Sequence, residues 1–343
     1  MTLHLVTGGT GYLGRHLVGK LLAAGKQVRV LARSSSDTSG LDGAEVVTGD
    51  VTKRGDLEAA LEGVGRVFHL AAETRDGQPA DLYDRTNHRA LTDLLELAAE
   101  RKIERLVYTS HYYAIGRSGE PRSAPDFVND ENWTHDPGDM HDAHEESKNN
   151  AENALSQRVS LGEPVLALIP TMMFGPEARP VTGPGELSKG NRIVAMLSDH
   201  ARGRFGPLSG DGKQLWNLVH VEDVAAAHMA VMDADDASGK WPPPAWIQWH
   251  YFCAGENIRA GDLFAQFGKA AGVAPPPCKP LKKPGLLGKL FGGGEVDPRA
   301  AIDAHSWAFS PEIAAGDWGY THRPFAEALA ETVEWMGKSG LLK

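Results

Sequence analysis

The chain has 343 residues, 41% of them hydrophobic and 23% charged, which is typical of a globular protein with one large core or two smaller ones. Its formal net charge of −10 argues against non-specific binding to nucleic acid. With only 2 cysteines and no apolar run of transmembrane length, we expect a cytoplasmic protein that has no disulfide framework and no nucleic-acid or membrane partner.

The first half of the chain alternates short apolar runs with stretches of helical spacing. Strands are predicted at residues 3–6, 27–32, 44–51, 66–71, 105–110 and 165–170. Helices are predicted between them at residues 12–24, 56–61, 81–100 and about 142–159. This alternation indicates an α/β protein with a Rossmann-type, doubly wound parallel sheet.

The second half begins with a change of composition after residue 170. Residues 175–190 are rich in Gly and Pro, and predicted helices (191–201, 222–232, 325–336) and strands (215–221, 247–254) follow. We therefore expect an NAD(P)-binding Rossmann domain of residues 1–175 plus about 214–235. A smaller α/β substrate-binding lobe is expected at about 176–213 and 236–343.

The first predicted strand and helix are joined by a glycine-rich turn in the segment LHLVTGGTGYLG, residues 3–14. Gly8 permits the turn, Gly11 permits close approach of a pyrophosphate, and Gly14 permits close packing of helix on strand. The free N–H groups of the first helical turn would then face the anion. The other cofactor neighbours predicted here are Thr10, Tyr12 and Leu13.

The order and spacing of several motifs resemble the extended short-chain dehydrogenase/reductase family. That family includes sugar-nucleotide epimerases and dehydratases, dihydroflavonol-type reductases and 3β-hydroxysteroid dehydrogenase-like enzymes. The resemblance covers nearly the whole chain and implies a nicotinamide cofactor and oxidoreductase chemistry. Its motifs are TGGTGYLG from Thr7, GDVT from Gly49, VFHLAA from Val67, VYTS from Val107, SKNNAE from Ser147, IPTMMFGP from Ile169, NLVHVEDVAAA from Asn217 and GYTHRPFAEALAETVEW from Gly319.

The end of the second predicted strand carries the residue that selects the cofactor. An acid there would bind the ribose of NAD, whereas Arg33, followed by Ser34, can bind the 2′-phosphate of NADP. NADP(H) is therefore preferred, and NAD(H) with Asp37 or Asp42 on the ribose is the alternative. The remaining cofactor contacts that the resemblance implies are Asp50, Val51, Leu70, Ala71, Ala72, Lys148 and Pro170, while Asn87 is expected to support the backbone.

The pattern departs from the family at the positions that handle protons. The family has a Tyr four residues before a Lys, and a Ser or Thr after the strand that ends VYTS. Here Lys148 is present, but His144 occupies the Tyr position and His111 the hydroxyl position. Imidazole can still carry a proton near neutral pH, and nearby positive charge would lower its pKa. We predict that these three residues act on a secondary alcohol or ketone.

Other functions remain open at this point. Tyr112 or Tyr113 could supply the missing phenol, and the chain could be a nucleotide-sugar epimerase or dehydratase or a redox-inactive, cofactor-binding regulator. A metal is not predicted, because the one candidate cluster is more simply a solvated loop. That cluster comprises His135, Asp136, His141, Asp142 and His144.

The residues expected around the substrate favour an apolar molecule. They are Met172, Met173, Phe174, Arg179, Phe205 and residues 112–117. Arg192, Arg202 and Arg204 could hold the second pyrophosphate of a sugar nucleotide, although arginines on a helix are usually solvated. Residues 279–291 mix basic and apolar side chains and are expected to form a lid or an ordered loop rather than a membrane-surface segment. The resemblance also implies a homodimer formed by helices 81–100 and 142–159.

Overall fold

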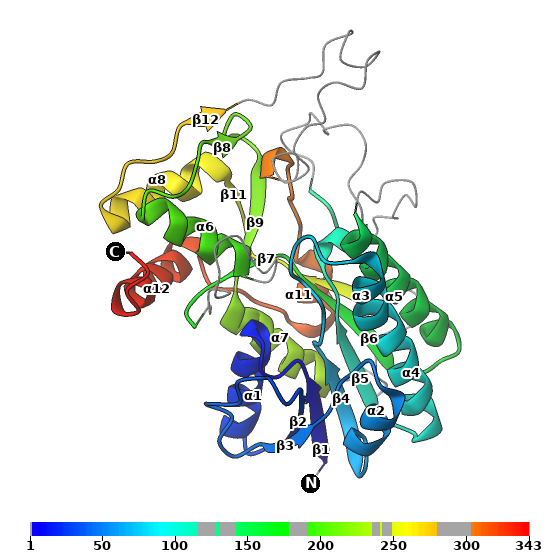
Figure 1. The fold of residues 1–343 in the computed structure, drawn as a ribbon. Helices are drawn as coiled ribbons and strands as arrows, with labels where there is room; N and C mark the ends of the chain where they lie inside the picture. The colour runs from blue at the N-terminus through cyan, green and yellow to red at the C-terminus, as the bar shows by residue number, and fades with distance from the viewer. Residues whose placement is uncertain are drawn as a thin grey trace.

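The fold comes from a computed structural model that describes residues 2–115, 128–130, 142–177, 191–234, 241, 249–279 and 303–342. Its centre is a parallel sheet of 7 strands in the order β10-β6-β5-β4-β1-β2-β3 (Figure 1). The strand order reverses direction at β1, as in doubly wound sheets, and this confirms the predicted fold class. The strands are β1 (Leu3–Thr7), β2 (Gln27–Ala32), β3 (Glu45–Thr48), β4 (Val64–His69), β5 (Arg105–Thr109), β6 (Val165–Pro170) and β10 (His250–Cys253).

Helices cover both faces of this sheet because its strands are apolar on both sides. In β1, Leu5 packs toward one layer of helices and Val6 toward the other, as the period of two in a strand requires. One layer contains α1 (Tyr12–Ala23) and α7 (Val221–Asp233), and the other contains α2 (Arg54–Ala60), α4 (Ala90–Glu100) and α5 (Ala143–Ser160) (Figure 1).

The helix predicted at residues 81–100 is interrupted in the structure. It begins as α3 (Ala80–Tyr83), continues as a π-helical turn (Asp84–Arg89) and ends as α4. The apolar side of α4 faces the sheet, since Leu91 and Leu94 are fully buried there. Such π-helical turns inside α-helices are rare and are often found at functional sites.

The second lobe is built around a small sheet in the order β11-β9-β7. Its core is rich in aromatic side chains, with Trp216 and Trp307 almost fully buried. The buried Asn217 side chain binds Gly255 and Phe309 and accepts a hydrogen bond of 2.7 Å from Thr171, so that the lobe is tied to the end of β6. Its elements are β7 (Met172–Phe174), α6 (Arg192–Ala201), β8 (Leu208–Ser209), β9 (Leu215–His220), β11 (Glu256–Arg259), α8 (Ala260–Ala271), β12 (Cys278–Lys279) and α12 (Phe325–Lys338).

The chain crosses between the two lobes more often than the predicted boundaries imply. Strand β10, expected in the second lobe, pairs with β6 in the main sheet, and α11 (Glu312–Trp318) packs against β10. Conversely, β9 was expected in the first domain, yet it joins the small sheet of the second lobe. Helix α7, which follows β9, packs against α1 in the first domain, where it was expected. Within the described residues, no helix is both long and apolar enough to span a membrane.

Candidate active site

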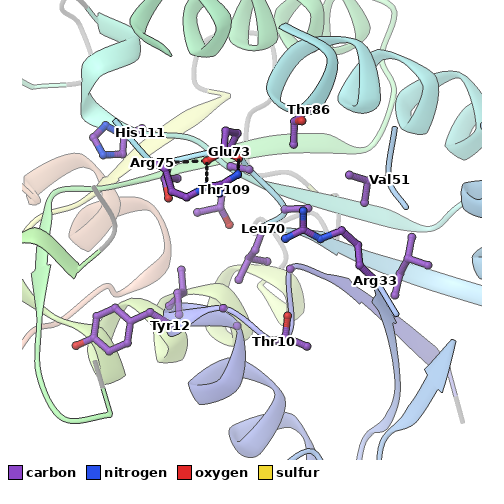
Figure 2. A pocket seen from close by; sticks show the side chains of 18 of the residues that line it. Thr10, Tyr12, Arg33, Val51, Leu70, Glu73, Arg75, Thr86, Thr109 and His111 are labelled. Carbon is purple, nitrogen blue, oxygen red and sulfur yellow. Dashed lines mark hydrogen bonds and ion pairs between the residues drawn. The ribbon is translucent and has the colours of Figure 1, made fainter. Parts of the chain in front are cut away.

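A cavity of about 410 Å³ runs along the carboxyl ends of the strands of the main sheet (Figure 2). Its lining comes from the segments that follow β1 to β6 in turn, which is where open α/β sheets bind their ligands. In Figure 2, Arg33 and His111 lie at opposite ends of the view, with Thr10 and Leu70 between them. The cavity is therefore elongated and crosses the point at which the strand order reverses.

Two glycines at the turn after β1 leave no space for a side chain. Gly8 has φ of +72°, and a Cβ atom there would lie 2.7 Å from the backbone nitrogen of Ala71. A Cβ atom on Gly14 would lie 2.2 Å from the carbonyl oxygen of Gly8. The N–H of Gly11 donates to that same oxygen at 2.9 Å and closes the turn. These contacts explain why glycine is needed at Gly8 and Gly14, while the role predicted for Gly11 stays a prediction.

The start of helix α1 suits an anion. Gly11 is its N-cap, no side chain of the described residues caps it, and its first turn contains no acidic residue. The backbone N–H groups at this end therefore face the cavity, which Thr10, Tyr12 and Leu13 line as predicted. The residues present fit the pyrophosphate of a dinucleotide.

Arg33 lies at the end of the cavity that follows β2 and β3. Its side chain is exposed, and among the described residues it makes no side-chain hydrogen bond and no ion pair. Ser34 does not line the cavity, and this prediction is corrected: the turn from Arg33 to Ser36, closed by a 2.9 Å hydrogen bond, brings Ser36 to the wall instead. Neither Asp37 nor Asp42 lines it.

Asp50 and Val51 follow β3 and line the cavity as predicted. The Asp50 carboxylate accepts two hydrogen bonds of 2.9 Å from the backbone and hydroxyl of Thr52. Partial burial opposes its charge, but these hydrogen bonds and the positive charge of Arg33 together hold the pKa of Asp50 below its usual range. The carboxylate is therefore ionised and held in place.

The segment after β4 contributes more than was predicted. Leu70, Ala71 and Ala72 line the cavity as expected, but so do Glu73 and Arg75, whose side chains form an ion pair at 2.7 Å (Figure 2). Glu73 directly follows the predicted VFHLAA motif and Arg75 lies two residues further on, so their position after a strand end was the available signal. Arg85 and Thr86 also line it, carried there by the π-helical turn, for which the sequence offers no pattern.

Asn87 supports this segment, as predicted. Its side chain accepts a hydrogen bond from the backbone of Glu73 at 2.7 Å and donates to the carbonyl of Glu73 at 3.1 Å. It also donates to the Ser147 hydroxyl at 3.0 Å. One buried amide thus joins the cavity wall after β4 to helix α5, which carries Lys148.

The other end of the cavity gathers His111, Lys148 and Pro170, all three as predicted. The Lys148 ammonium is buried and donates to the Tyr108 hydroxyl at 3.1 Å and to the Thr109 carbonyl at 3.3 Å. Burial lowers its pKa to about 8, although the nearby Glu152 carboxylate acts in the opposite direction. An ammonium has three donors, so one N–H remains for a ligand in the cavity.

His111 has a defined proton arrangement. Its Nδ1 accepts a hydrogen bond of 3.1 Å from the backbone N–H of Tyr113. A neutral imidazole that accepts at Nδ1 must carry its proton on Nε2. His111 is therefore built to donate a hydrogen bond from Nε2 rather than to accept one there.

His144 does not line the cavity. It is fully buried at the start of α5, and its ring centre lies 5.5 Å from that of His111 and 5.4 Å from that of Tyr83. The expectation that His144 faces the substrate is corrected, because the side chain is fully buried among aromatic rings and is not part of the cavity wall. His111 and Lys148 are the two members of the predicted trio that reach the wall.

A second, smaller cavity of about 10 Å³ lies in the other lobe, between α6, β7 and β9. Tyr112 and Tyr113 line this cavity and not the larger one, so they do not replace the missing phenol beside Lys148. Met173 lines both cavities and so lies between them.

The residues proposed for the metal alternative are only partly described. His135, Asp136 and His141 lie outside the described residues. The same is true of Arg179, expected at the substrate, and of most of the segment 279–291, expected to be a lid or an ordered loop. Asp142 accepts a hydrogen bond of 2.8 Å from the Glu145 N–H and so caps helix α5. In the described part of the chain, no group of three His, Cys, Asp or Glu side chains is placed to hold a metal.

The fold and this cavity define a dinucleotide-binding α/β protein with ionisable side chains at one end of its site. A family model, the NAD dependent epimerase/dehydratase family, matches residues 4–241. The chain belongs to this family, and hence to the extended short-chain dehydrogenase/reductase enzymes that its motifs resemble.

Several known proteins are similar to this chain. Sterol demethylase protein B of Methylococcus capsulatus is 32% identical over 234 residues, which are 67% of this chain and 65% of that protein. Short-chain dehydrogenase/reductase family 42E member 1 of Homo sapiens is 26% identical over 360 residues, 98% of this chain and 87% of that protein. The crystal structure of gox2253 has a TM-score of 0.81 and 28% identity, with 100% of both chains covered.

Proposed function

We propose that the enzyme uses NADP(H). Arg33 lies at the rim of the cavity with its guanidinium available, and Ser36 lines the wall close to it. The competing acid Asp37 is held away, since its carboxylate pairs with Arg15 at 3.7 Å. A guanidinium can bind a 2′-phosphate through two parallel hydrogen bonds, whereas it gives no comparable gain with a ribose hydroxyl.

The cofactor proposal is tested by replacing Arg33 with Asp and titrating both reduced cofactors by fluorescence. Loss of a charge-assisted hydrogen bond costs about 1.5–3 kcal/mol, which is roughly a 10- to 150-fold loss of affinity for NADPH. NADH affinity should hold or rise, because an acid in this position suits the ribose. Equal affinity of the wild-type protein for NADPH and NADH would contradict the proposal.

We further propose that the enzyme transfers a hydride between NADP(H) and a secondary alcohol or ketone of a small, apolar substrate. The observation that carries this proposal is the juxtaposition of His111 and Lys148 with the apolar side chain of Met173 at one end of the cavity. When bound, NADP(H) supplies the hydride donor or acceptor at its nicotinamide ring. The protein must then orient the substrate oxygen and move one proton.

In this proposal His111 orients the substrate oxygen and Lys148 moves the proton. The Nε2–H of His111 donates to the oxygen and stabilises the negative charge that develops on it. The Lys148 ammonium, with its pKa lowered to about 8, gives its proton to that oxygen during reduction, and the neutral amine takes the proton during oxidation. His144 packs behind His111 and positions it.

This assignment is tested by His111→Phe, with His111→Asn as the conservative variant. Removing one donor to a developing oxyanion lowers kcat by about 10²- to 10³-fold. The Asn side chain keeps an N–H donor and should restore part of the rate, while NADPH affinity stays near that of the wild type in both variants. Unchanged kcat in His111→Phe would refute the role of His111.

A nucleotide-sugar substrate is less well supported by the described residues. Its second pyrophosphate would need several cations, but Arg202 donates to the Gly340 carbonyl and Arg204 pairs with Asp199. Arg192 reaches the smaller cavity, where Asp303 already neutralises it. The name of one relative, sterol demethylase protein B, agrees with an apolar substrate rather than a sugar nucleotide.

A further inference from the structure

The smaller cavity contains a buried polar group that the proposed reaction does not use. Trp216, at 1% exposure, lines this cavity, and its indole Nε1–H is buried without a hydrogen-bond acceptor among the described residues. A buried N–H without an acceptor is rare in native proteins and costs about 1–3 kcal/mol. The fold therefore places a residue with an unsatisfied donor in the wall of this cavity, and a ligand oxygen there would satisfy it.

The cavity is next to the proposed substrate site. Met173 on β7 lines both cavities, and Met172 on β7 and Met196 on α6 add apolar side chains to the wall of the smaller one. A substrate whose reacting carbon lies beside Lys148 and His111 would extend along these methionines toward Trp216. Methionine side chains are flexible and suit an irregular apolar body.

The charge in the cavity favours a neutral acceptor. Arg192 is almost fully buried and forms an ion pair with Asp303, so the pair has no net charge. A substrate carboxylate would add a second negative charge beside Asp303 in a site with little water, which is unfavourable. The Tyr112 and Tyr113 hydroxyls hydrogen-bond to each other and stay protonated, because burial raises the pKa of both phenols.

The size of the cavity agrees with one oxygen atom. Its volume of about 10 Å³ approaches the roughly 10–15 Å³ that a single water requires. We infer that Trp216 and Arg192 form a specificity subsite for a neutral carbonyl or hydroxyl oxygen at the far end of an apolar substrate. This inference rests on the proposed function, and it defines the substrate class as a diketone or keto-alcohol on an apolar skeleton.

The inference can be tested first with the wild-type enzyme and NADPH. The substrates are three pairs of ring ketones of increasing length: cyclohexanone, decalone and androstanone, each with the dione that carries a second carbonyl at the opposite end. We expect one dione to be reduced with a kcat/KM about 10-fold or more above that of its monoketone. Reduction of the monoketones without a preference for any dione would overturn the subsite and leave the proposed function standing. An enzyme that binds NADPH but reduces none of the ketones would overturn both.

The second test replaces Trp216 with Phe, which keeps an aromatic ring and removes the N–H. The preference for the dione should fall to about twofold or less, while the rate with the monoketone stays within about threefold of the wild type. Trp318→Phe is the matched control, because the Trp318 Nε1–H is also buried without an acceptor among the described residues but lies on α11, away from both cavities. A preference that survives in Trp216→Phe would show that the Trp216 N–H does not select the second oxygen and would overturn the inference.

Discussion

Helix α1 contains two glycines, Gly14 and Gly19, that the structure predicts will respond in opposite ways to the same substitution. An added Cβ atom on Gly14 would lie 2.2 Å from the carbonyl oxygen of Gly8, more than 1 Å inside ordinary van der Waals contact. An added Cβ atom on the exposed Gly19 would meet nothing within 4 Å. Both positions are helical, so the gain in helix propensity from Gly to Ala is shared and the contact makes the difference.

The expected magnitudes follow from these contacts. Gly19→Ala should stabilise the protein by about 0.5–1 kcal/mol, because alanine loses less backbone entropy on folding. Gly14→Ala should destabilise it by about 1–3 kcal/mol, because the obstructing atoms belong to the backbone and relief requires the helix to move away from β1. That movement also withdraws the first-turn N–H groups from the cavity, so NADPH affinity should fall by about 10-fold.

The assay measures unfolding by urea and NADPH binding by fluorescence titration for the wild type and both variants. Gly19→Ala is the control for general effects of alanine in this helix, and it should bind NADPH as the wild type does. The reasoning would be refuted if Gly14→Ala were as stable as Gly19→Ala and bound NADPH normally. That result would mean that the helix does not need its close approach to the glycine turn.

Three further predictions concern protons and the support of the site. Ketone reduction should slow and alcohol oxidation should speed up as pH rises through about 8, the pKa of Lys148, and Lys148→Met should remove this dependence of kcat. Burial lowers the pKa of His69 to about 3 and that of His228 to about 4, from the ordinary value of 6.5. As the pH falls below 6.5, these two histidines therefore become protonated in the unfolded chain before they do so in the folded protein. The free energy of unfolding should thus fall between pH 6.5 and 4, by roughly 3 kcal/mol from His228 alone. Urea unfolding of His228→Gln should show a smaller fall over the same pH range. Asn87→Ala should lower the free energy of unfolding by about 1–3 kcal/mol, because it leaves buried partners unsatisfied, whereas Asn153→Ala on the exposed side of α5 should change it by less than about 0.5 kcal/mol.

Most of the cofactor site could be predicted from the sequence, because strand ends and glycine turns are local features. The apolar runs before Gly8, Arg33, Asp50 and Leu70 determine where each strand stops, and a parallel sheet brings those ends to one edge. Gly8 and Gly14 were predicted for the physical reasons that the structure shows, since their Cβ atoms would meet backbone atoms.

The parts that were missed depend on long-range packing. The π-helical turn that carries Arg85 and Thr86 to the cavity has an ordinary helical sequence. Strand β10 is separated from β6 by 79 residues along the chain, and no local pattern shows which sheet it joins. The i, i+4 spacing correctly placed His144 on the helix of Lys148, but the rings of Tyr83 and Tyr113 enclose it, and sequence spacing does not report such contacts.

Deuterium transfer would show directly whether this enzyme moves a hydride between NADP(H) and an apolar secondary alcohol or ketone, as we propose. The most direct test incubates the purified enzyme with apolar ketones and NADPH that carries deuterium at the reactive carbon of its nicotinamide ring, and measures deuterium in the product by mass spectrometry. We predict an alcohol with one deuterium on its carbinol carbon. Tight binding of NADPH without deuterium transfer to any ketone would contradict the claim and favour a cofactor-binding protein without reductase activity.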